Sequence, residues 1–392
     1  MTKVLIIFGP TATGKTQLAL QLTRKFQGEL ISADSRQVYK GLDIGTGKLS
    51  IQQLNNSTIK QFKGYWIVDG IKIHGFDLVD PPSHEPGSKK FPEPGSRLGT
   101  FTVADFLEFA HTSMIRIIEV NRLPIIVGGT GFYIKALTEG VGSIGIPADQ
   151  KLRKKLEKMS ADELYQKLLD ADPHRAASMN QSDRANPRRL IRAIEIAQTA
   201  TYNPGLRQAS PQPASLSSRG EHNPGLSRQS TPSTLGVRVA FARPASLSSR
   251  GEHTPGVSLP TTNYKLLTTN YLLLGLTAPN DYLYQRADQW LQERLDHDMI
   301  GEVKNLLGKK VDPIWLDNLG IEYRWLSRYV LEQIDKEEAL KRLKGDIHNF
   351  IRRQKTWFKQ LKGIQLFDIT KLNWRKNLEK TVRDWYTTCD NG

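Results

Sequence analysis

The sequence contains a single cysteine, Cys389, close to its C-terminal end. One thiol cannot close an intramolecular disulfide and cannot build a cysteine-based metal site, which fits a reducing compartment. The eight histidines show no HExxH-like spacing. No stretch approaches the roughly 20 apolar residues that a membrane-spanning helix requires, and the apolar run at the N-terminus is too short for a signal peptide. We therefore expect a soluble cytoplasmic protein with no membrane partner.

Negative charge is also scarce relative to positive charge. Among 392 residues, 55 Lys and Arg stand against 40 Asp and Glu, which gives a formal net charge of +15. Such an excess indicates a polyanionic partner, either a nucleic acid or an acidic surface, and composition does not choose between them. A chain of this length has room for two domains and a substantial core.

The N-terminal residues form the most informative pattern. An apolar run at residues 3–8 predicts a buried strand, which leads into a GxxxxGKT loop and then a helix. The expected phosphate-binding residues are the eight of this loop: Gly9, Pro10, Thr11, Ala12, Thr13, Gly14, Lys15 and Thr16. In such a loop, backbone N–H groups surround an anion, the lysine reaches a terminal phosphate and the threonine hydroxyl binds Mg²⁺. The chain is therefore predicted to bind a diphosphate or a triphosphate.

Strands and helices are expected to alternate in the first part of the chain. A second strand at residues 29–32, a helix at 103–119 and a strand at 124–127 follow the first strand. This order predicts an α/β fold with a parallel sheet that binds its ligands at the carboxyl ends of the strands.

The rest of the chain divides into segments of different composition. Residues 201–262 are rich in Pro, Ser, Gly and Arg and contain the sequence PASLSSRGEH twice, so we expect a disordered insertion there. A shorter Pro/Gly-rich insertion is expected at residues 81–99. The predicted organisation is a P-loop core at 1–140, a helical inserted segment at 141–200, the insertion at 201–262, and a return to a core strand and C-terminal helices at 263–392.

Two further turns place polar groups at predicted strand ends. Asp34 follows the second strand, where a carboxylate can act as a general base or hold Mg²⁺ through water; the plain alternative is a helix N-cap. Residues 35–37 add polar groups to the same rim. Thr130 lies in the turn GGTG at 128–131, whose glycines either allow a ligand to approach closely or simply form a turn.

Two basic stretches follow. Four arginines lie between residues 184 and 192 with no acid among them. On a helix, Arg188, Arg189 and Arg192 share one side, which suits contacts with phosphates; the alternative is a solvated helix paired with acids elsewhere. In the second stretch, RRQKTWFK at 352–359, Trp357 either stacks on a base or, as we favour, anchors an amphipathic helix in the core.

Six stretches occur in a recognisable order along the chain: GPTATGKT, SADSRQVY with DIGTGK, IIVGGTGFYIKAL, NPRRLIRAIEI, LGIEYR and RRQKTWF. Together they resemble the tRNA dimethylallyltransferase (tRNA isopentenyltransferase) family and cover most of the chain outside the two insertions. The DIGTGK stretch lacks the Ala-Lys-Pro ending usual in the family, and near Asp281 we find no counterpart of a family arginine. The resemblance implies a P-loop NTPase-like parallel sheet flanked by helices, with an inserted helical tRNA-binding domain.

The resemblance also implies a reaction. Dimethylallyl diphosphate, and not ATP, would occupy the P-loop, and its isoprenyl group would pass to N6 of the adenosine 3′ of the tRNA anticodon. Lys15, Thr16 and Mg²⁺ would stabilise the departing diphosphate, Asp34 would accept the N6 proton, and Thr130 would complete the catalytic set. The anticodon stem-loop would contact a group of residues in the matching motifs: Asp34, Ser35, Arg36, Gln37, Thr130, Arg153, Arg188, Arg189, Leu190, Ile191 and Arg192. We expect a monomer.

Two rival functions fit parts of the same pattern. A P-loop small-molecule kinase would also use the GKT loop and an acidic strand end, and a nucleic-acid-binding protein could use the loop to sense a nucleotide. The sequence shows neither the second acidic strand of an ATP-driven motor nor an arginine-rich nucleotide-kinase lid. A prenyltransferase is therefore our leading hypothesis.

Overall fold

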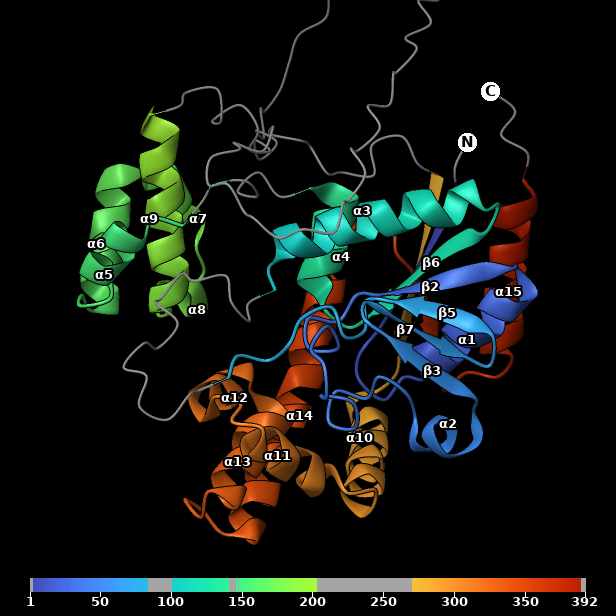
Figure 1. Ribbon diagram of the computed structural model, residues 1–392. Coiled ribbons are helices and arrows are strands. Elements are labelled where there is room, and N and C mark those ends of the chain that lie inside the picture. The colour runs from blue at the N-terminus through green and yellow to red at the C-terminus, as the bar shows by residue number, and fades with distance from the viewer. Residues whose placement is uncertain (1–2, 84–100, 141–145, 147, 203–269, 389–392) are drawn as a thin grey trace, which may run out of the picture.

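A mixed eight-stranded sheet forms the centre of the computed structural model, which describes residues 3–83, 101–140, 146, 148–202 and 270–388 (Figure 1). Across the sheet the strand order is β3-β4-β5-β2-β6-β1-β7-β8. The strands are β1 (Lys3–Phe8), β2 (Gly28–Ser32), β3 (Ile59–Phe62), β4 (Tyr65–Val68), β5 (Ile71–His74), β6 (Leu123–Gly128), β7 (Asn270–Thr277) and β8 (Gln365–Asp368). From β5 to β8 in this order, neighbouring strands are parallel, as an α/β fold predicts.

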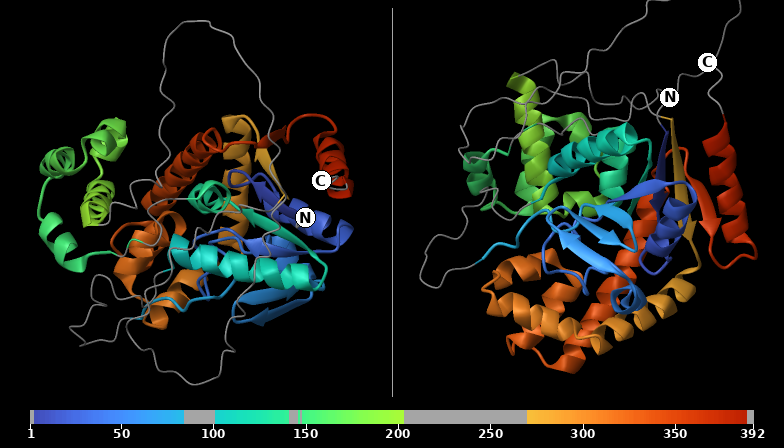
Figure 2. Two further views of the ribbon diagram at one scale, coloured as in Figure 1. Left: turned by 90° about the horizontal axis from the view of Figure 1, so that it is seen from above. Right: turned by 45° about the vertical axis from the view of Figure 1, so that its right-hand side comes forward.

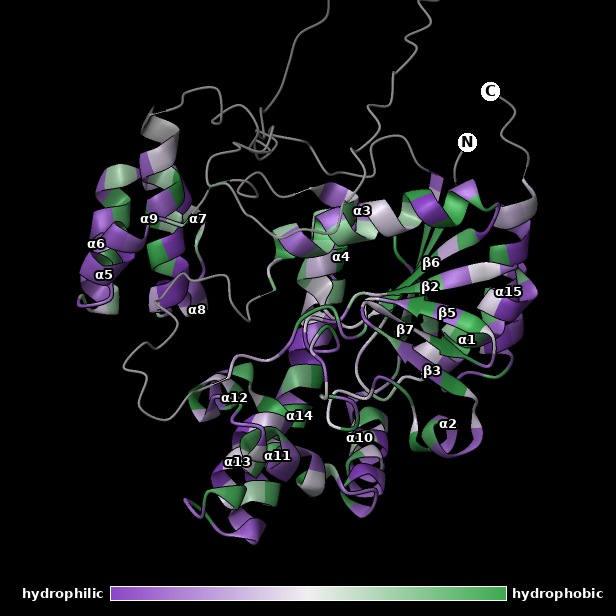
Figure 3. Ribbon diagram, in the orientation of Figure 1, coloured by the Kyte–Doolittle hydropathy of each residue, from purple (hydrophilic) through white to green (hydrophobic). Residues whose placement is uncertain are grey.

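The parallel part of the sheet is buried on both faces. In β1, Val4 and Ile6 belong to one hydrophobic cluster, whereas Leu5 and Ile7 belong to another, because successive side chains point to opposite faces. Strands of this kind are continuous apolar runs. The hydropathy colouring of Figure 3 shows the contrast between these strands and the mixed helix surfaces.

Helices cover both faces of the sheet. The covering helices nearest to the P-loop core are α1 (Lys15–Lys25), α3 (Val103–Glu119), α4 (Gly131–Glu139) and α15 (Trp374–Thr387). On one face α3 packs on α4, where the rings of Phe106 and Tyr133 stack with centroids 4.2 Å apart. On the other face α1 lies beside α15, and an ion pair joins Lys25 to Glu379.

The parallel register brings three loops to one edge of the sheet. Phe8 of β1 pairs with Gly128 of β6, and Ser32 of β2 pairs with Val127 of β6. The P-loop, the loop that carries Asp34 and the Gly-Gly-Thr turn therefore leave the sheet side by side. This is the edge at which α/β proteins bind their ligands.

One edge of the sheet differs from the expected parallel arrangement. Strands β3, β4 and β5 form an antiparallel meander that the sequence analysis did not include. Its second turn is Asp69-Gly70, whose φ angles are 47° and 78°. Two positive φ angles are what a two-residue hairpin turn of this type needs, so a local signal for the hairpin was present in the sequence.

A separate helical cluster follows the first half of the core. Its helices are α5 (Gln150–Leu156), α6 (Ala161–Ala171), α7 (Pro173–Ser178), α8 (Gln181–Arg184) and α9 (Pro187–Tyr202). They enclose a small hydrophobic core of their own, and the cluster stands apart from the sheet in Figures 1 and 2. The predicted insertion at 201–262 lies outside the described residues except for the last two residues of α9, and the predicted insertion at 81–99 lies outside them from residue 84.

The C-terminal helices form a second group below the strand ends in Figure 1. They are α10 (Asn280–Asp296), α11 (Met299–Gly308), α12 (Pro313–Leu319), α13 (Ile321–Val330) and α14 (Lys336–Phe358). The long helix α14 runs from this group to the sheet, where the Phe358 ring lies 3.8 Å from the ring of Phe8. No helix in the described part of the chain is long and apolar enough to cross a membrane.

Candidate active site

The P-loop has a backbone shape that few residues tolerate. Ala12 and Gly14 have φ angles of 66° and 81°, in the left-handed region. A Cβ atom on Gly9 would lie 2.9 Å from the carbonyl oxygen of Leu276, so the loop passes β7 with no room for a side chain. The first N–H groups of α1, starting at Lys15, have no partner within the helix, which is the arrangement that binds anions.

The Lys15 side chain is held inside this loop. Its Nζ donates a hydrogen bond of 2.7 Å to the carbonyl oxygen of Pro10. Burial lowers the pKa of Lys15 to about 8, and the nearby charge of Asp34 opposes that shift. An anionic phosphate beside the ammonium would favour its charged form further. Lys15 is therefore a half-buried cation in an environment that an anionic ligand would complement.

A cavity of about 770 Å³ opens beside Lys15. One wall consists of the P-loop and the residues at the ends of β2 and β6, and helix α10 forms a second wall. The short helix α2 (Ile51–Asn56) lines a third side. The functional groups on its lining include Lys15, Thr16, Asp34, Gln37, Arg286 and Arg294.

The structure places Thr130 beside the loop that carries Asp34, where Asp34 and Gly129 line this cavity. The Oδ1 atom of Asp34 accepts a hydrogen bond of 2.9 Å from the N–H of Arg36. The hydroxyl oxygen of Thr130 accepts from the N–H of Ser35 at 3.1 Å, and the N–H of Thr130 donates to the carbonyl oxygen of Ala33 at 3.3 Å. Two of the three predicted catalytic residues, Asp34 and Thr130, are therefore joined through the backbone of residues 33–36.

Arg36 and Gln37 hold the same loop in place. The guanidinium of Arg36 forms an ion pair with Glu322 of α13. Burial alone would lower the pKa of Arg36, but the charges of Glu322 and Asp34 outweigh it and raise that pKa. The amide of Gln37 accepts from the Ser32 hydroxyl at 2.7 Å and donates to the carbonyl oxygen of Gly47 at 3.2 Å. Both side chains are thus engaged within the protein.

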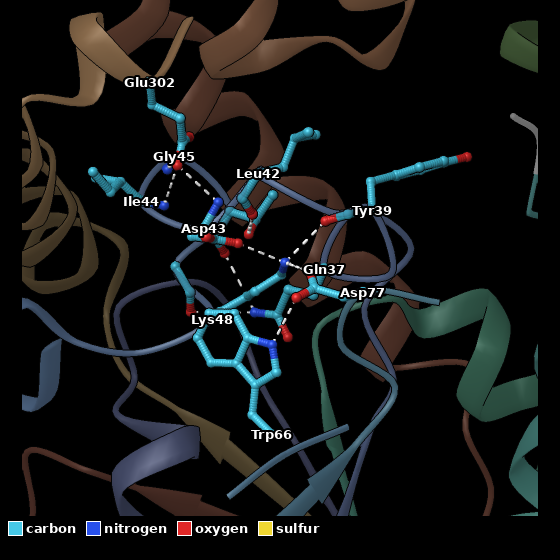
Figure 4. A network of polar contacts seen from close by, with 12 residues as sticks. Gln37, Tyr39, Leu42, Asp43, Ile44, Gly45, Lys48, Trp66, Asp77 and Glu302 are labelled. Carbon is cyan, nitrogen blue, oxygen red and sulfur yellow. Dashed lines mark hydrogen bonds and ion pairs between the residues drawn. The ribbon is translucent and has the colours of Figure 1, made fainter. Parts of the chain in front are cut away.

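A buried lysine organises the DIGTGK loop (Figure 4). The ammonium of Lys48 is fully buried and forms ion pairs with Asp43, at 2.6 Å, and with Asp77. Asp77 also accepts from the indole N–H of Trp66 at 2.7 Å. A buried cation without such partners would be strongly destabilising, so the loop conformation and this pairing depend on each other.

Glu302 of α11 fixes the other end of that loop (Figure 4). Its carboxylate accepts hydrogen bonds from the N–H groups of Asp43, Ile44 and Gly45, at 2.8, 2.6 and 3.0 Å. The phenol of Tyr323 donates to it at 2.8 Å. Burial raises the pKa of Glu302, and these hydrogen bonds oppose the shift. The DIGTGK loop is therefore held by Glu302 at one end and by the buried Lys48 at the other.

Helix α10 supplies two arginines that the sequence analysis missed. The Nε of Arg286 donates to the carbonyl oxygen of Ala12 at 2.8 Å, so this side chain touches the P-loop itself. Arg294 is 2 % exposed, its guanidinium lies 3.9 Å from the ring centroid of Trp290, and its Nε has no hydrogen-bond partner within the described residues. Burial lowers the pKa of Arg294 to about 10. The sequence contained a signal for this arrangement, because Arg286, Trp290 and Arg294 are each four residues apart and therefore share one side of the helix.

Helix α14 contributes a third residue that the sequence analysis missed. The side-chain oxygen of Gln354 accepts from the N–H of Thr11 at 2.9 Å, and its amide nitrogen donates to the carbonyl oxygen of Gly129 at 2.9 Å. Gln354 therefore joins the P-loop to the Gly-Gly-Thr turn. Beside it, Trp357 is partly buried against one of the two core clusters, which agrees with the favoured core-anchor interpretation.

Comparison with known proteins identifies the family. A model of the IPP transferase family matches residues 96–361, and a model of the isopentenyl transferase family matches residues 2–71. The tRNA dimethylallyltransferase 1 of Geotalea daltonii is 30% identical over 358 residues, which is 91% of this chain and 87% of that relative. The chain belongs to the tRNA dimethylallyltransferase family. The tRNA dimethylallyltransferase of Anoxybacillus flavithermus is 29% identical and covers 94% of this chain and 91% of its own.

Solved structures agree with that membership. The tRNA isopentenylpyrophosphate transferase of Bacillus halodurans has a TM-score of 0.56 at 25% identity and covers 98% of this chain and 97% of its own. A eukaryotic dimethylallyltransferase solved in the course of acting on tRNA has a TM-score of 0.65 at 21% identity, covering 99% and 80%. At that identity the second similarity concerns the fold alone, which is the P-loop NTPase-like α/β fold of the dimethylallyltransferases.

The predicted tRNA-binding arginines of this family member are mostly paired with acids. Arg153 of α5 makes two hydrogen bonds to Glu195, of 2.6 and 2.8 Å, and Arg192 pairs with the same carboxylate at 3.1 Å. Arg189 pairs with Asp183. Glu195 is 2 % exposed, and hydrogen bonds from both arginines lower its pKa against the opposing effect of burial. Pairing with acids was the alternative interpretation of this helix.

Three other residues that were predicted to contact tRNA lie on the same helix but have different environments. Leu190 and Ile191 were expected to contact tRNA, but their side chains, 0 % and 7 % exposed, belong to the core of the helical cluster. Side-chain contact with tRNA is not open to them in this arrangement. Arg188 is exposed, and its guanidinium makes a long hydrogen bond of 3.5 Å to the neutral amide of Asn318.

The donor set beside the P-loop has the chemistry that a hard divalent cation prefers. Thr16, the second residue of α1, and Asp34 both line the cavity and offer oxygen atoms, which suits Mg²⁺ better than a softer metal. The described residues contain no cluster of three His, Cys, Asp or Glu side chains that could hold a metal without further ligands. A magnesium ion here would need further oxygen ligands, from water or from a bound anion.

Proposed function

We propose that this protein transfers a dimethylallyl group from dimethylallyl diphosphate to N6 of the adenosine 3′ of the tRNA anticodon and releases diphosphate. Family membership supports dimethylallyl transfer to tRNA, because the similar enzymes carry that name. The structural observation that carries the proposal is the presence of Lys15 and Asp34 in one cavity. The ammonium of Lys15 can bind the leaving diphosphate, and the carboxylate of Asp34 can take a proton from the attacking amine.

In this mechanism the bond between the allylic carbon and the diphosphate oxygen breaks as the bond to N6 forms. An exocyclic amine is a weak nucleophile, so the allylic carbon must carry positive charge while the diphosphate departs. The ammonium of Lys15 and the first N–H groups of α1 stabilise the charge that develops on the leaving oxygen atoms. Mg²⁺, held by the Thr16 hydroxyl and by phosphate oxygens, would supply further neutralisation when bound.

The proton that N6 loses passes to the carboxylate of Asp34. One oxygen of Asp34 is already bound to the N–H of Arg36, and this hydrogen bond fixes the orientation of the carboxyl group. The Thr130 hydroxyl accepts from Ser35, so its own hydrogen is available to a substrate oxygen or nitrogen. The target base must leave its stack to reach this rim.

The basic surface beside the cavity supports tRNA as the acceptor. On α14, Arg352 and Arg353 are exposed on the turn that precedes Gln354, and Lys359 is exposed just after the helix ends. Phosphate contacts of this kind position a nucleic acid without reading its sequence. The kinase alternative has no comparable explanation for this surface or for the family match.

A transfer assay tests the proposal directly. Purified protein is incubated with labelled dimethylallyl diphosphate, Mg²⁺ and tRNA that lacks the modification, and in parallel with ATP and small acceptors. We expect label in the tRNA, at the adenosine 3′ of the anticodon after nuclease digestion. ATP turnover without transfer of label to tRNA would favour the kinase and overturn the proposal.

A further inference from the structure

The end of helix α14 lies directly against the ends of three core strands. Gln354 contacts the loop after β1 and the turn after β6, and the ammonium of Lys355 donates to the carbonyl oxygen of Ala278, just after β7, at 2.9 Å. Phe358 packs on Phe8 of β1. One helix therefore touches the ends of β1, β6 and β7.

Gln354 occupies the central position of this contact. Its side chain is 5 % exposed. The oxygen accepts from the N–H of Thr11 at 2.9 Å and from the Thr11 hydroxyl at 3.3 Å, while the nitrogen donates to Gly129 at 2.9 Å. A glutamine is suited to this task because its amide both accepts and donates. Methionine would fill the space and do neither, and glutamate would only accept.

The glycines of the Gly-Gly-Thr turn make room for this helix. A Cβ atom on Gly129 would lie 2.6 Å from the amide nitrogen of Gln354, and one on Gly131 would lie 3.0 Å from the Cβ of Trp357. From the sequence, these glycines either let a ligand approach closely or simply form a turn. The structure shows that Gly129 and Gly131 face α14, so the turn is built to fit against it.

Through these two contacts Gln354 connects the groups that act on the donor with those that act on the acceptor. Thr11 directly follows Pro10, whose carbonyl oxygen accepts a hydrogen bond from the ammonium of Lys15. Gly129 precedes Thr130, whose hydroxyl is bonded to the loop that carries Asp34. A shift of α14 would thus move the P-loop and the Asp34 rim together.

We propose that Gln354 is a positioning residue that couples the binding of tRNA along α14 to the shape of the P-loop, so that tRNA and the diphosphate favour each other's binding. The proposal rests on the function proposed above, because exposed cations of the same helix, such as Arg352 and Arg353, are taken to meet tRNA. Coupling of this kind is reciprocal: each ligand raises the affinity for the other by the same factor.

The coupling factor is the quantity to measure. The affinity of Mg²⁺–inorganic diphosphate is determined with and without an unmodified anticodon stem-loop RNA, for the wild-type chain and for Gln354→Met. We expect wild type to bind diphosphate about tenfold more tightly in the presence of RNA, within the usual range for coupled sites, and Gln354→Met to show a ratio near one. Gln285→Met is the matched control, because Gln285 is exposed on α10 and does not line the cavity.

Gln354→Glu adds a second test that does not depend on the methionine variant folding. It keeps an acceptor for the N–H of Thr11 and loses the donor to Gly129, so its ratio should also fall toward one. A folded variant with the wild-type ratio, or a wild-type chain with no coupling, would overturn the proposal. Failure of the proposed function is distinguishable, because wild type would then place no label in tRNA.

Discussion

The two walls of the cavity are built in different ways. On the strand wall, Lys15 begins the helix after the P-loop, Asp34 comes two residues after β2, and Thr130, beside the cavity lining, comes two residues after β6. The register of the buried strands sets the positions of all three. On the helix wall, Arg286 of α10 lines the cavity, and Gln354 of α14 lies just outside its lining. Both are far away in the sequence from the strand wall, and both contact its main-chain atoms. The strand wall carries the groups that we propose to react, and the side chains of the helix wall contact the loops that hold those groups. Variants on the two walls should therefore fail in different ways.

The largest effect is expected at Asp34 on the strand wall. Asp34→Asn keeps an acceptor for the N–H of Arg36 but removes the base that takes the N6 proton. We expect the single-turnover rate to fall by roughly 10²–10⁴, the usual contribution of a general base, while tRNA affinity changes by only a few fold. A variant that keeps near-normal single-turnover rates would assign Asp34 a structural role in place of a catalytic one.

Lys15→Ala should come next, and it should act on the donor alone. A charge-assisted hydrogen bond contributes about 1.5–3 kcal/mol, so we expect the affinity for dimethylallyl diphosphate to fall by about 10- to 150-fold. The affinity for tRNA, measured by titration with labelled stem-loop RNA, should be unchanged. Equal affinity of both proteins for the diphosphate would rule out this contact.

The pKa of Lys15 predicts how that contact depends on pH. In the free protein its ammonium has a pKa of about 8 because it is buried, so its positive charge is complete well below pH 8 and is lost as the pH rises through 8. Diphosphate affinity should fall above pH 8, and binding there should take up a proton, which calorimetry in buffers of different ionisation enthalpy measures. In Lys15→Ala this inflection should disappear. In Asp34→Asn it should move to lower pH, because the charge that raises the pKa of Lys15 is gone.

The strand wall was largely predictable from the sequence, and the helix wall was not. Residues 3–8 and 103–119 form a strand and a helix with the expected bounds, because apolar runs and helical spacing are local signals. Gln354 lies within a recognised motif, but its role depends on meeting Thr11, which is 343 residues earlier. Such a contact exists only after the chain has folded. The meander at β3–β5 was missed despite its Asp69-Gly70 turn.

The arginine helix gives an intermediate case. Three of its arginines suggested a phosphate-binding face, but Glu195 lies one turn after Arg192 and forms an ion pair with it. This neighbour was visible in the sequence, whereas the contribution of Arg153 to the same carboxylate was not. The burial of Leu190 and Ile191 could also have been predicted from the apolar spacing of the helix. The resemblance to family motifs placed them in the tRNA-binding set without regard to that spacing.

Gly47 tests how closely the helix wall fits the strand wall. Its φ angle is 62°, and a Cβ atom would lie 2.6 Å from Nη2 of Arg294. Gly47→Ala should therefore lower the free energy of unfolding by about 1–3 kcal/mol, the range for a strained backbone position, as measured by urea denaturation. Gly308→Ala is the control, because the space around Gly308 is open. Equal stability of the two variants would show that neither the positive φ angle nor the contact with Arg294 penalises a side chain at residue 47.

The smallest effect is expected at Arg188, outside both walls. It is exposed, and its hydrogen bond goes to the neutral Asn318, whereas Arg189 and Arg192 are paired with carboxylates. If Arg188 grips a tRNA phosphate, Arg188→Gln should lower tRNA affinity at physiological salt. It should also reduce the slope of log affinity against log salt by about 0.7–0.9, the value for one lost phosphate contact. The Michaelis constant for dimethylallyl diphosphate should not change, since Arg188 does not line the cavity.

The charge-matched control is Arg184→Gln. The guanidinium of Arg184 lies over the ring of Tyr165, so its removal should leave the slope unchanged. An equal loss of slope in both variants would mean that the net charge of the helical cluster, and not a contact at Arg188, attracts the tRNA.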